Sequence, residues 1–573
     1  MIKLLQFKKT AILLSAFFLS LNFSNTLQAQ SFTWAKNMGG TSNDYGYSVA
    51  VDASGNVYTT GTFEGTADFD PGVGTFTLTS TGTADIFISK LDANGNFVWA
   101  KGIGGTTNDY GLTVAVDASG NVYTTGYFRN VADFDPGVGT FNLTSTSSSD
   151  DIFISKLDAS GDFVWAKSIG GSNTDKCSGM KIDAAGNVFI TGSFRGTTDF
   201  DPGAGIFNLT SAGNDDIFVS KLDASGNFVW AKGIGGTMVD VSQAITIDAT
   251  GNVYTCGYFT DVVDFNPGVA TYTLTSSIYN IFISKLDGNG DFVWAKHMVG
   301  GGDASQAITV DGAGNVYTTG YIQGTTDFDP GVGTFTLTSV GAYDLFISKL
   351  DANGDFVWAK SMGALNNESG LGITVDATGN VYTTGYFGNT VDFDPSVGTT
   401  TLVAPAGNYS IFISKLDALG NFVSAKSIGN STGSCISYAI TLDAANNIYT
   451  TGYYTGATDF DPDGGIFNLT PPSTQADVFI LKLSSSTVSI AELNNEINVV
   501  LYPNPTNSII NIKLDEEIQT ISIYNSLGAL VQTEKTNSFS IEQLSSGLYI
   551  LKVKTEKELK QFVLLKNNSS LNY

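Results

Sequence analysis

Short segments rich in β-branched and aromatic residues recur along the chain, and polar turns separate them. In the first copy these segments are residues 49–51, 57–61, 86–91 and 97–101. Segments of this length, bounded by Gly, Asn and Asp, predict four β-strands. The Asp of each turn can accept hydrogen bonds from its own turn, and Gly takes the positive φ that such turns need. Residues 86–88 are three apolar residues in succession, which favours a sheet buried on both faces.

This pattern repeats seven times at intervals of 63 to 67 residues. The marker of each copy is Asp-Phe-Asp-Pro-Gly or a close variant, and the copies begin at Asp68, Asp133, Asp199, Asp264, Asp327, Asp392 and Asp459. The variants carry Asn266, Ser396, or Asp463 inserted before Gly464. Four strands in each of seven copies predict an all-β fold, a seven-bladed β-propeller with four-stranded blades.

The fourth strand of the last copy is missing from its expected place. A Trp-Ala-Lys strand ends the earlier copies, at Trp99, Trp165, Trp230, Trp294 and Trp358, with Ser424 in place of Trp in the sixth copy. The seventh copy stops after residues 478–483, whereas residues 31–36 contain Phe32, Trp34 and Lys36 in the same pattern. The N-terminal strand is therefore predicted to complete the last blade and to remove the free edges of the ring.

The two ends of the chain differ from the repeats. Residues 1–29 carry Lys3, Lys8 and Lys9, an apolar run and the small residue Ala29, the layout of a secretory signal peptide. This run is too short to span a membrane, which takes about 20 residues, and no later stretch is a transmembrane candidate. We assign residues 31–483 to the propeller and 484–497 to a linker. Residues 498–573 alternate apolar and polar positions, as in a small Ig-like β-sandwich.

Two resemblances follow from these motifs. Residues 31–483 resemble the SBBP family of bacterial β-propeller repeats, through Val-Asp-Ala-Ser-Gly-Asn-Val-Tyr-Thr-Thr-Gly (51–61) and Ile-Phe-Ile-Ser-Lys-Leu-Asp (86–92). The C-terminal part resembles the sorting domain of type IX secretion substrates in Bacteroidetes, through Tyr502, Pro503, Asn504 and Pro505, residues 523–528, and the segment that begins at Gly547. The second resemblance implies export through the periplasm by the type IX machinery and removal of the domain. The protein would then be released or held at the cell surface.

The net charge of −26 arises from 28 Lys and Arg against 54 Asp and Glu. Residues 31–483 alone hold 18 bases and 45 acids, many of the acids in the repeated turns. Such a chain has no basic surface for nucleic acid, so we expect no nucleic-acid partner. Hydrophobic residues make up 42% of the chain, which excludes general disorder.

The Asp-Phe-Asp-Pro-Gly motif is the first candidate for chemistry. In an extended stretch its two Asp side chains point the same way, and clustered carboxylates suit calcium. The candidate ligands are Asp68, Asp70, Asp133, Asp135, Asp199, Asp201, Asp327 and Asp329. The alternative, which we favour, is that Asp, Pro and Gly specify the turn itself. We therefore expect no cofactor, with calcium as the one candidate.

The loops between strands two and three, and those between copies, share one face of a propeller and are where binding is expected. Residues 43–46, 175–177, 297–299 and 366–368 belong to this set. His297 is the only histidine, and no catalytic constellation is visible. Cys177, Cys256 and Cys435 are interpreted as buried apolar residues, with a Cys177–Cys256 disulfide left open.

The leading functional hypothesis is a non-enzymatic binding or adhesion module for an extracellular protein or glycan. The alternative is an extracellular carbohydrate-active enzyme with a carboxylate site on the loop-rich face. An acid pair specific to one blade would favour the enzyme, and the sequence shows none.

Overall fold

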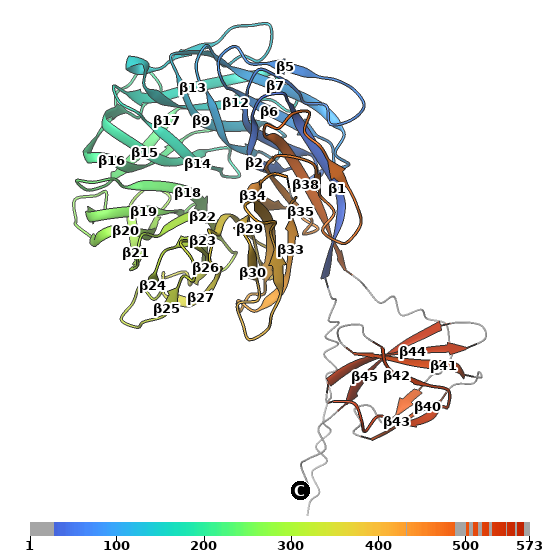
Figure 1. The fold of residues 1–573 in the computed structure, drawn as a ribbon. Coiled ribbons are helices and arrows are strands. Elements are labelled where there is room, and N and C mark those ends of the chain that lie inside the picture. Colours follow the sequence, from blue (N-terminus) through green and yellow to red (C-terminus); the bar gives the residue numbers. More distant parts are fainter. Residues whose placement is uncertain are drawn as a thin grey trace, which may run out of the picture. The chain divides into compact units, whose positions relative to one another are not determined.

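The computed structural model describes residues 28–430, 432–487, 500–502, 508–513, 518–525, 530–545, 547–555 and 559–566 (Figure 1). The predicted signal peptide lies outside these residues except for its last two positions, which begin the first strand. The chain divides into a large unit, Leu27–Val488, and a small unit that includes Ser489–Tyr573. The regular secondary structure of the described residues is β-strand, apart from one short 3-10 helix, η1 (Thr146–Ser148).

The large unit consists of seven antiparallel four-stranded modules, six of them built from strands that follow one another along the chain apart from the inserted hairpins. The first four modules are β2 (Asp44–Val51), β3 (Val57–Phe63), β6 (Asp85–Leu91) and β7 (Phe97–Gly105); β8 (Tyr110–Val116), β9 (Val122–Arg129), β12 (Asp150–Leu157) and β13 (Phe163–Gly171); β14 (Lys176–Ile182), β15 (Val188–Asp199), β16 (Asn208–Leu222) and β17 (Phe228–Ile234); and β18 (Val241–Ile247), β19 (Val253–Asp264), β20 (Thr273–Leu286) and β21 (Phe292–Met298). The last three are β22 (Ala304–Val310), β23 (Val316–Ile322), β26 (Asp344–Leu350) and β27 (Phe356–Met362); β28 (Ser369–Val375), β29 (Val381–Gly388), β32 (Tyr409–Leu416) and β33 (Phe422–Ile428); and β34 (Cys435–Leu442), β35 (Ile448–Tyr454), β38 (Asp477–Thr487) and β1 (Gln28–Gly40).

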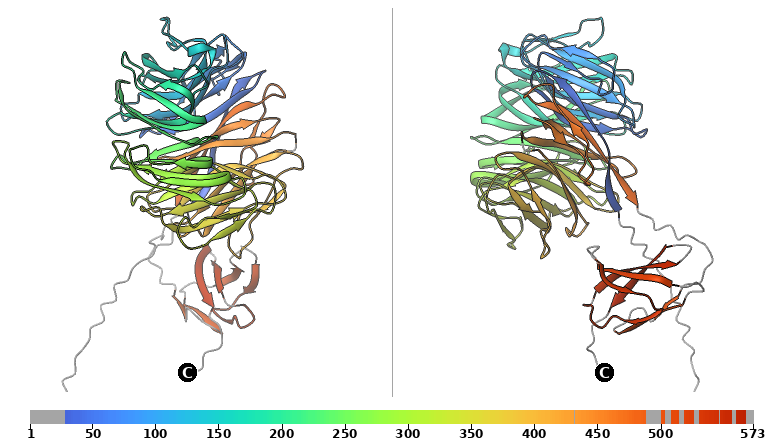
Figure 2. Two further views of the ribbon diagram at one scale, coloured as in Figure 1. Left: turned by 90° about the vertical axis from the view of Figure 1, so that its left-hand side faces the viewer. Right: turned by 45° about the vertical axis from the view of Figure 1, so that its right-hand side comes forward.

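Module 7 takes its fourth strand from the other end of the large unit. β1 pairs antiparallel with β38, with Phe32 opposite Leu483, Trp34 opposite Lys482 and Lys36 opposite Ile480. Figure 2 shows the blue β1 alongside the orange β38. β38 also continues to Thr487, so the strand extends four residues into the segment predicted to be a linker.

The first strands of consecutive modules lie side by side around the centre. β2 contacts β8, the series continues through β14, β18, β22, β28 and β34, and β34 contacts β2 again. The core fills the spaces between neighbouring modules. In module 1, Phe87 packs toward module 7, whereas Ile86 and Ile88 pack toward module 2, and all three are fully buried. This alternation explains why three apolar residues follow one another in a strand.

The long connection between the second and third strands is a short β-hairpin, not the loop that its turn residues suggested. The separate hairpins are β4 (Thr66–Asp68) with β5 (Thr77–Thr79), β10 (Val131–Asp133) with β11 (Asn142–Thr144), β24 (Thr325–Asp327) with β25 (Thr336–Thr338), β30 (Thr390–Asp392) with β31 (Thr401–Val403), and β36 (Thr458–Asp459) with β37 (Asn468–Leu469). In modules 3 and 4 the hairpin continues the main strands. Outside module 6, the hairpin also pairs or forms a bridge with the fourth strand of the preceding module, as β4 does with β1 through Asp68 and Gly39.

The small unit contains two antiparallel sheets. One is β39 (Val500–Tyr502), β40 (Ile509–Lys513) and β43 (Ser538–Ser540), and the other is β42 (Leu530–Glu534), β41 (Ile518–Asn525), β44 (Gly547–Thr555) and β45 (Leu559–Lys566). Ile510 and Ile512 of the first sheet share a buried cluster with Ile521 and Ile523 of the second. The unit therefore has its own hydrophobic core.

Candidate functional site

Strand direction assigns the loops of the large unit to two faces. Because the four strands of a module alternate in direction, the start of the first, the end of the second and the start of the third lie at one edge. The hairpins and the connections between modules leave from this edge, which we call the loop-rich face. The tight Asp-x-x-Gly turns lie at the opposite edge.

Tyrosines gather on the loop-rich face around the inner strands. Ring pairs lie close together in several modules: Tyr258 with Tyr279 at 5.1 Å, Tyr321 with Tyr343 at 4.7 Å, Tyr386 with Tyr409 at 4.9 Å, Tyr110 with Tyr127 at 4.8 Å, and Tyr45 with Tyr453 at 5.1 Å between centroids. Tyr47 and Tyr438 join them, 5.3 Å apart. These twelve residues form the tyrosine arc, which is half-buried apart from the exposed Tyr279.

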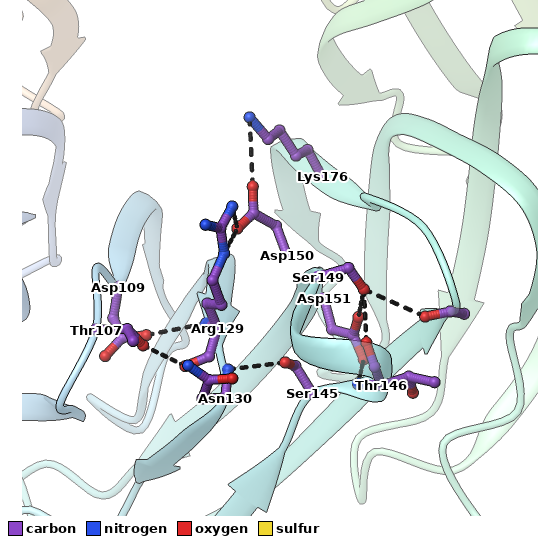
Figure 3. A network of polar contacts seen from close by, with 11 residues as sticks. Thr107, Asp109, Arg129, Asn130, Ser145, Thr146, Ser149, Asp150, Asp151 and Lys176 are labelled. Carbon is purple, nitrogen blue, oxygen red and sulfur yellow. Dashed lines mark hydrogen bonds and ion pairs between the residues drawn. The ribbon is translucent and has the colours of Figure 1, made fainter.

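Charged groups of modules 2 and 3 interrupt the tyrosine arc (Figure 3). Arg129 Nη2 lies 2.7 Å from Asp150 Oδ1, and Lys176 Nζ lies 3.6 Å from Asp150 Oδ2. Arg195 donates two hydrogen bonds to Asp215, of 2.8 and 3.0 Å. Arg129 and Arg195 are the only arginines of the chain. We call Arg129, Lys176 and Arg195, with their two aspartates, the basic sector.

A cavity of about 260 Å³ lies among the seven first strands. Tyr47 and Tyr438 of the tyrosine arc line it, together with Gln243, Gln306 and Lys181. Because every module contributes one strand, the cavity lies at the centre of the large unit. Figure 1 shows these inner strands, such as β14, β18, β22 and β34, at the middle of the modules.

Buried carboxylates lie beneath the connections between modules. Burial raises the pKa of Asp44, Asp109, Asp175 and Glu368 to about 7, and that of Asp240 to about 6. Each accepts backbone N–H groups of its connection, as Asp175 does from Gly171 at 2.8 Å. A second set lies at equivalent positions of the third strands, where burial raises the pKa of Asp216 to about 7 and of Asp477 to about 8. The carboxylates of the first set recur from module to module and hold the connections between modules in place.

These raised pKa values predict that the protein is more stable at pH 5 than at pH 8. A carboxyl group whose pKa is raised on folding binds its proton preferentially in the folded state. Its contribution to the free energy of unfolding is fully present below the unfolded-state pKa of about 4. This contribution is lost as the pH rises through about 6 to 8. Thermal unfolding between pH 4.5 and 8.5 measures this slope. Asp477→Asn should raise stability at pH 8 by on the order of a few kcal/mol and flatten the slope.

The aspartates of the tight turns determine the pH below which stability falls again. Hydrogen bonds within the turn of Asp248 outweigh its partial burial and lower its pKa to about 2. The stabilisation that ionised Asp248 gives to the folded state is therefore lost only below about pH 4. A melting temperature that rises steadily from pH 5 to pH 8 would contradict the assignment of the buried carboxylates.

The calcium candidates act as turn acceptors. Asp68 Oδ1 accepts the N–H groups of Asp70 at 3.0 Å and Phe76 at 2.8 Å, and Asp70 Oδ1 accepts that of Gly72 at 2.8 Å. The same bonds recur at Asp133 and Asp135, Asp199 and Asp201, and Asp327 and Asp329. Within the described ranges, no group of three or more His, Cys, Asp or Glu is arranged to hold a metal. These bonds support the turn role, and the calcium alternative stays a prediction.

The remaining sequence candidates lie apart from one another. His297 is half-buried on β21, where its ring lies 5.9 Å from that of Phe259. Cys177, Cys256 and Cys435 are buried and free, so the Cys177–Cys256 disulfide is not formed. In the small unit, Tyr502 is 48% exposed at the end of β39, and Gly547 begins β44. Pro503, Asn504 and Pro505 lie outside the described residues.

Two segments of the chain match described protein families. Residues 33–62 match the family described as Beta-propeller repeat, and residues 500–565 match the Secretion system C-terminal sorting domain. The chain carries propeller repeats and a type IX sorting tail. Such a tail marks a protein for export, so this protein is secreted or displayed at the cell surface. The part of the chain that the structure describes contains no helix able to cross a membrane.

Curated relatives match only in part. An uncharacterized WD repeat-containing protein of Acanthamoeba polyphaga mimivirus is 23% identical over 470 residues, which cover 68% of this chain and 34% of that protein. The Regulatory protein FlaEY of Caulobacter vibrioides is 25% identical over 393 residues, covering 65% of this chain and 38% of that protein. The chain thus spans little more than a third of the length of these relatives.

Solved structures show a weak likeness. A protein of unknown function from Bacteroides caccae has a TM-score of 0.30 at 9% identity, covering 60% of this chain and 89% of that one. The extracellular domain of a putative hybrid two component system from B. thetaiotaomicron has a TM-score of 0.15 at 11% identity, covering 93% of this chain and 100% of that one.

Proposed function

We propose that the exported protein is a non-enzymatic binding module for an extracellular glycan, and that the tyrosine arc is its contact surface. In this proposal the seven modules are the blades of a closed β-propeller that β1 completes. The small unit is an Ig-like β-sandwich that the type IX machinery recognises. The observation that carries the function is the concentration of half-buried tyrosines around one face of a rigid ring.

Tyrosine suits such a surface because its ring is apolar and its hydroxyl is polar. A sugar presents both apolar C–H faces and hydroxyl groups, so one tyrosine can meet both. The rings of the tyrosine arc are partly packed against one another, so little side-chain entropy remains to be lost on binding. The strands beneath them form a scaffold that holds the contacts in fixed positions.

The enzyme alternative has less support. The carboxylates nearest the loop-rich face, such as Asp44, Asp109 and Asp175, are buried and accept backbone N–H groups. They also recur from module to module, whereas a catalytic acid pair would be specific to one module. The charged cluster that is specific to a few modules, the basic sector, is built on Arg and Lys paired with Asp.

Replacing Tyr321 and Tyr386 with Ala is expected to weaken glycan binding about tenfold or more, since truncated aromatic anchors typically cost 2 kcal/mol or more. A panel of bacterial and host glycans, screened with the full-length mature protein, identifies the ligand, and calorimetry then compares the variant. Ser193→Ala is the matched control, because Ser193 holds the same strand position in module 3, outside the tyrosine arc. Unchanged affinity in the tyrosine variant, or hydrolysis of the bound glycan, would refute the proposal.

A further inference from the structure

The central cavity contains a single charged side chain. The seven first strands place equivalent residues at the level of Lys181, each opposite the second residue of its second strand. These residues are Ala50, Ala115, Lys181, Thr246, Thr309, Thr374 and Thr441. Among the residues that the structure describes, Lys181 is the only charged one that lines the cavity. Module 3 thus has a lysine at a position where the other six modules have an alanine or a threonine.

Lys181 lacks a partner within the described part of the chain. Lys176, on the same strand, reaches Asp150, whereas no hydrogen bond or ion pair holds Lys181. Its side chain is accessible to solvent, yet the strands around it exclude enough water to lower the pKa of its ammonium group. No neighbouring carboxylate raises that pKa. A partly desolvated ammonium group without a counter-ion favours an anionic ligand.

The other cavity residues suit the hydroxyl groups of a sugar. Gln243 and Gln306 offer amides, Thr309 and Thr374 offer hydroxyls, and these residues come from three neighbouring modules. The volume of about 260 Å³ lies just below the range of about 300–1,000 Å³ that holds drug-sized ligands. The cavity therefore suits a ligand of about the size of a single sugar ring.

The charge of the cavity favours a monoanion. One ammonium group can neutralise one carboxylate, and such charge-assisted hydrogen bonds are strong. The surplus of acids in the ring, 45 against 18 bases in residues 31–483, opposes a dianion such as phosphate more strongly. The basic sector, which includes Lys176 on the same strand, reduces this repulsion near the cavity.

We infer that the central cavity binds the carboxylate of an acidic sugar, with Lys181 as its counter-ion. The inference rests on the proposed function, because Tyr47 and Tyr438 belong to both the tyrosine arc and the cavity lining. It adds the chemical class of the ligand: a glycan that contains uronic acid, with one acidic sugar held in the cavity.

The test compares D-glucuronate with D-glucose as probes, by ligand-observed NMR and calorimetry on the full-length mature protein. We expect the wild type to prefer glucuronate. Lys181→Thr, which installs the residue of modules 4 to 7, should remove the preference and weaken glucuronate binding about tenfold or more. Lys101→Thr is the control, since Lys101 lies on a fourth strand and pairs with Asp162 at 3.7 Å. Added salt should weaken the binding of glucuronate and not of glucose.

The outcomes separate the two proposals. Equal binding of glucuronate and glucose to the wild type, or unchanged glucuronate affinity in Lys181→Thr, would overturn the cavity assignment. If a polysaccharide still binds through Tyr321 and Tyr386 in that case, the proposed function stands without an acidic sugar. If glucuronate binds through Lys181 but the tyrosine variant keeps its glycan affinity, the cavity assignment holds and the tyrosine surface is wrong.

Discussion

Deletion of residues 31–36 is expected to lower the unfolding temperature of the large unit sharply. These residues form the centre of β1, in which Trp34 is 8% exposed and Ala35 is 1% exposed. Loss of a buried Trp side chain alone typically costs about 3–5 kcal/mol. The deletion also leaves the edge of β38 without its partner strand, which invites aggregation. Calorimetry and urea unfolding of the mature protein measure the loss.

A disulfide between β1 and β38 should have the opposite effect and raise the unfolding temperature. Ser31 and Ser484 face each other across β1 and β38, with their Oγ atoms 2.7 Å apart. Replacing both with Cys and oxidising the pair should stabilise the ring by up to about 5 kcal/mol, and reduction should remove the gain. An unfolding temperature that neither the deletion nor the disulfide changes would mean that β1 does not close the ring.

The tryptophan position explains why this closure could be predicted from the sequence. Trp99 packs over the turn between the third and fourth strands of the next module, where a Cβ atom on Gly161 would lie 3.1 Å from its ring. Trp358 and Gly420 repeat this contact one junction before the last. Module 7 has no such turn, because its third and fourth strands come from opposite ends of the large unit. Ser424, which replaces Trp, is the residue that would face the missing turn.

The inserted residue of the seventh copy has a matching explanation. Asp463 accepts the backbone N–H of Phe32 at 2.7 Å and forms an ion pair with Lys426. It therefore links β1 to the fourth strand of module 6 at the junction where the tryptophan contact is absent. In the sequence Ser424 and Asp463 are only departures from the repeat, and the structure brings both to the same junction.

Other features could not be predicted, because they depend on contacts between strands far apart in sequence. The hairpin strands contain only two or three residues beside strong turn formers, so the sequence pattern predicts a loop at these positions. The tyrosine arc gathers residues from six modules, two from each, although the recurrent Tyr at positions such as 127, 258 and 321 was a visible signal. Arg129, Asp150 and Lys176 are separated by 21 and 26 residues and meet only through strand pairing.

Removal of residues 498–573 is expected to abolish export, so that the propeller accumulates in the periplasm. The match to the sorting domain covers residues 500–565, and the small unit has its own buried core. The large unit has separate cores, so its folding should survive the removal. Cell fractionation and surface labelling with an antibody to the large unit measure the outcome. Truncated protein that still reaches the surface would refute the sorting role.

A pair of point variants tests whether the folded small unit, rather than the mere presence of this segment, is the export signal. Ile523 is fully buried between the two sheets, so Ile523→Asp should unfold the unit and reproduce the truncation. Leu530 is 56% exposed at the start of β42, so Leu530→Asp introduces the same charge with little effect on folding. Export lost in the first variant and kept in the second would show that the secretion machinery recognises the folded small unit. Equal export of both variants would show that it reads a linear segment.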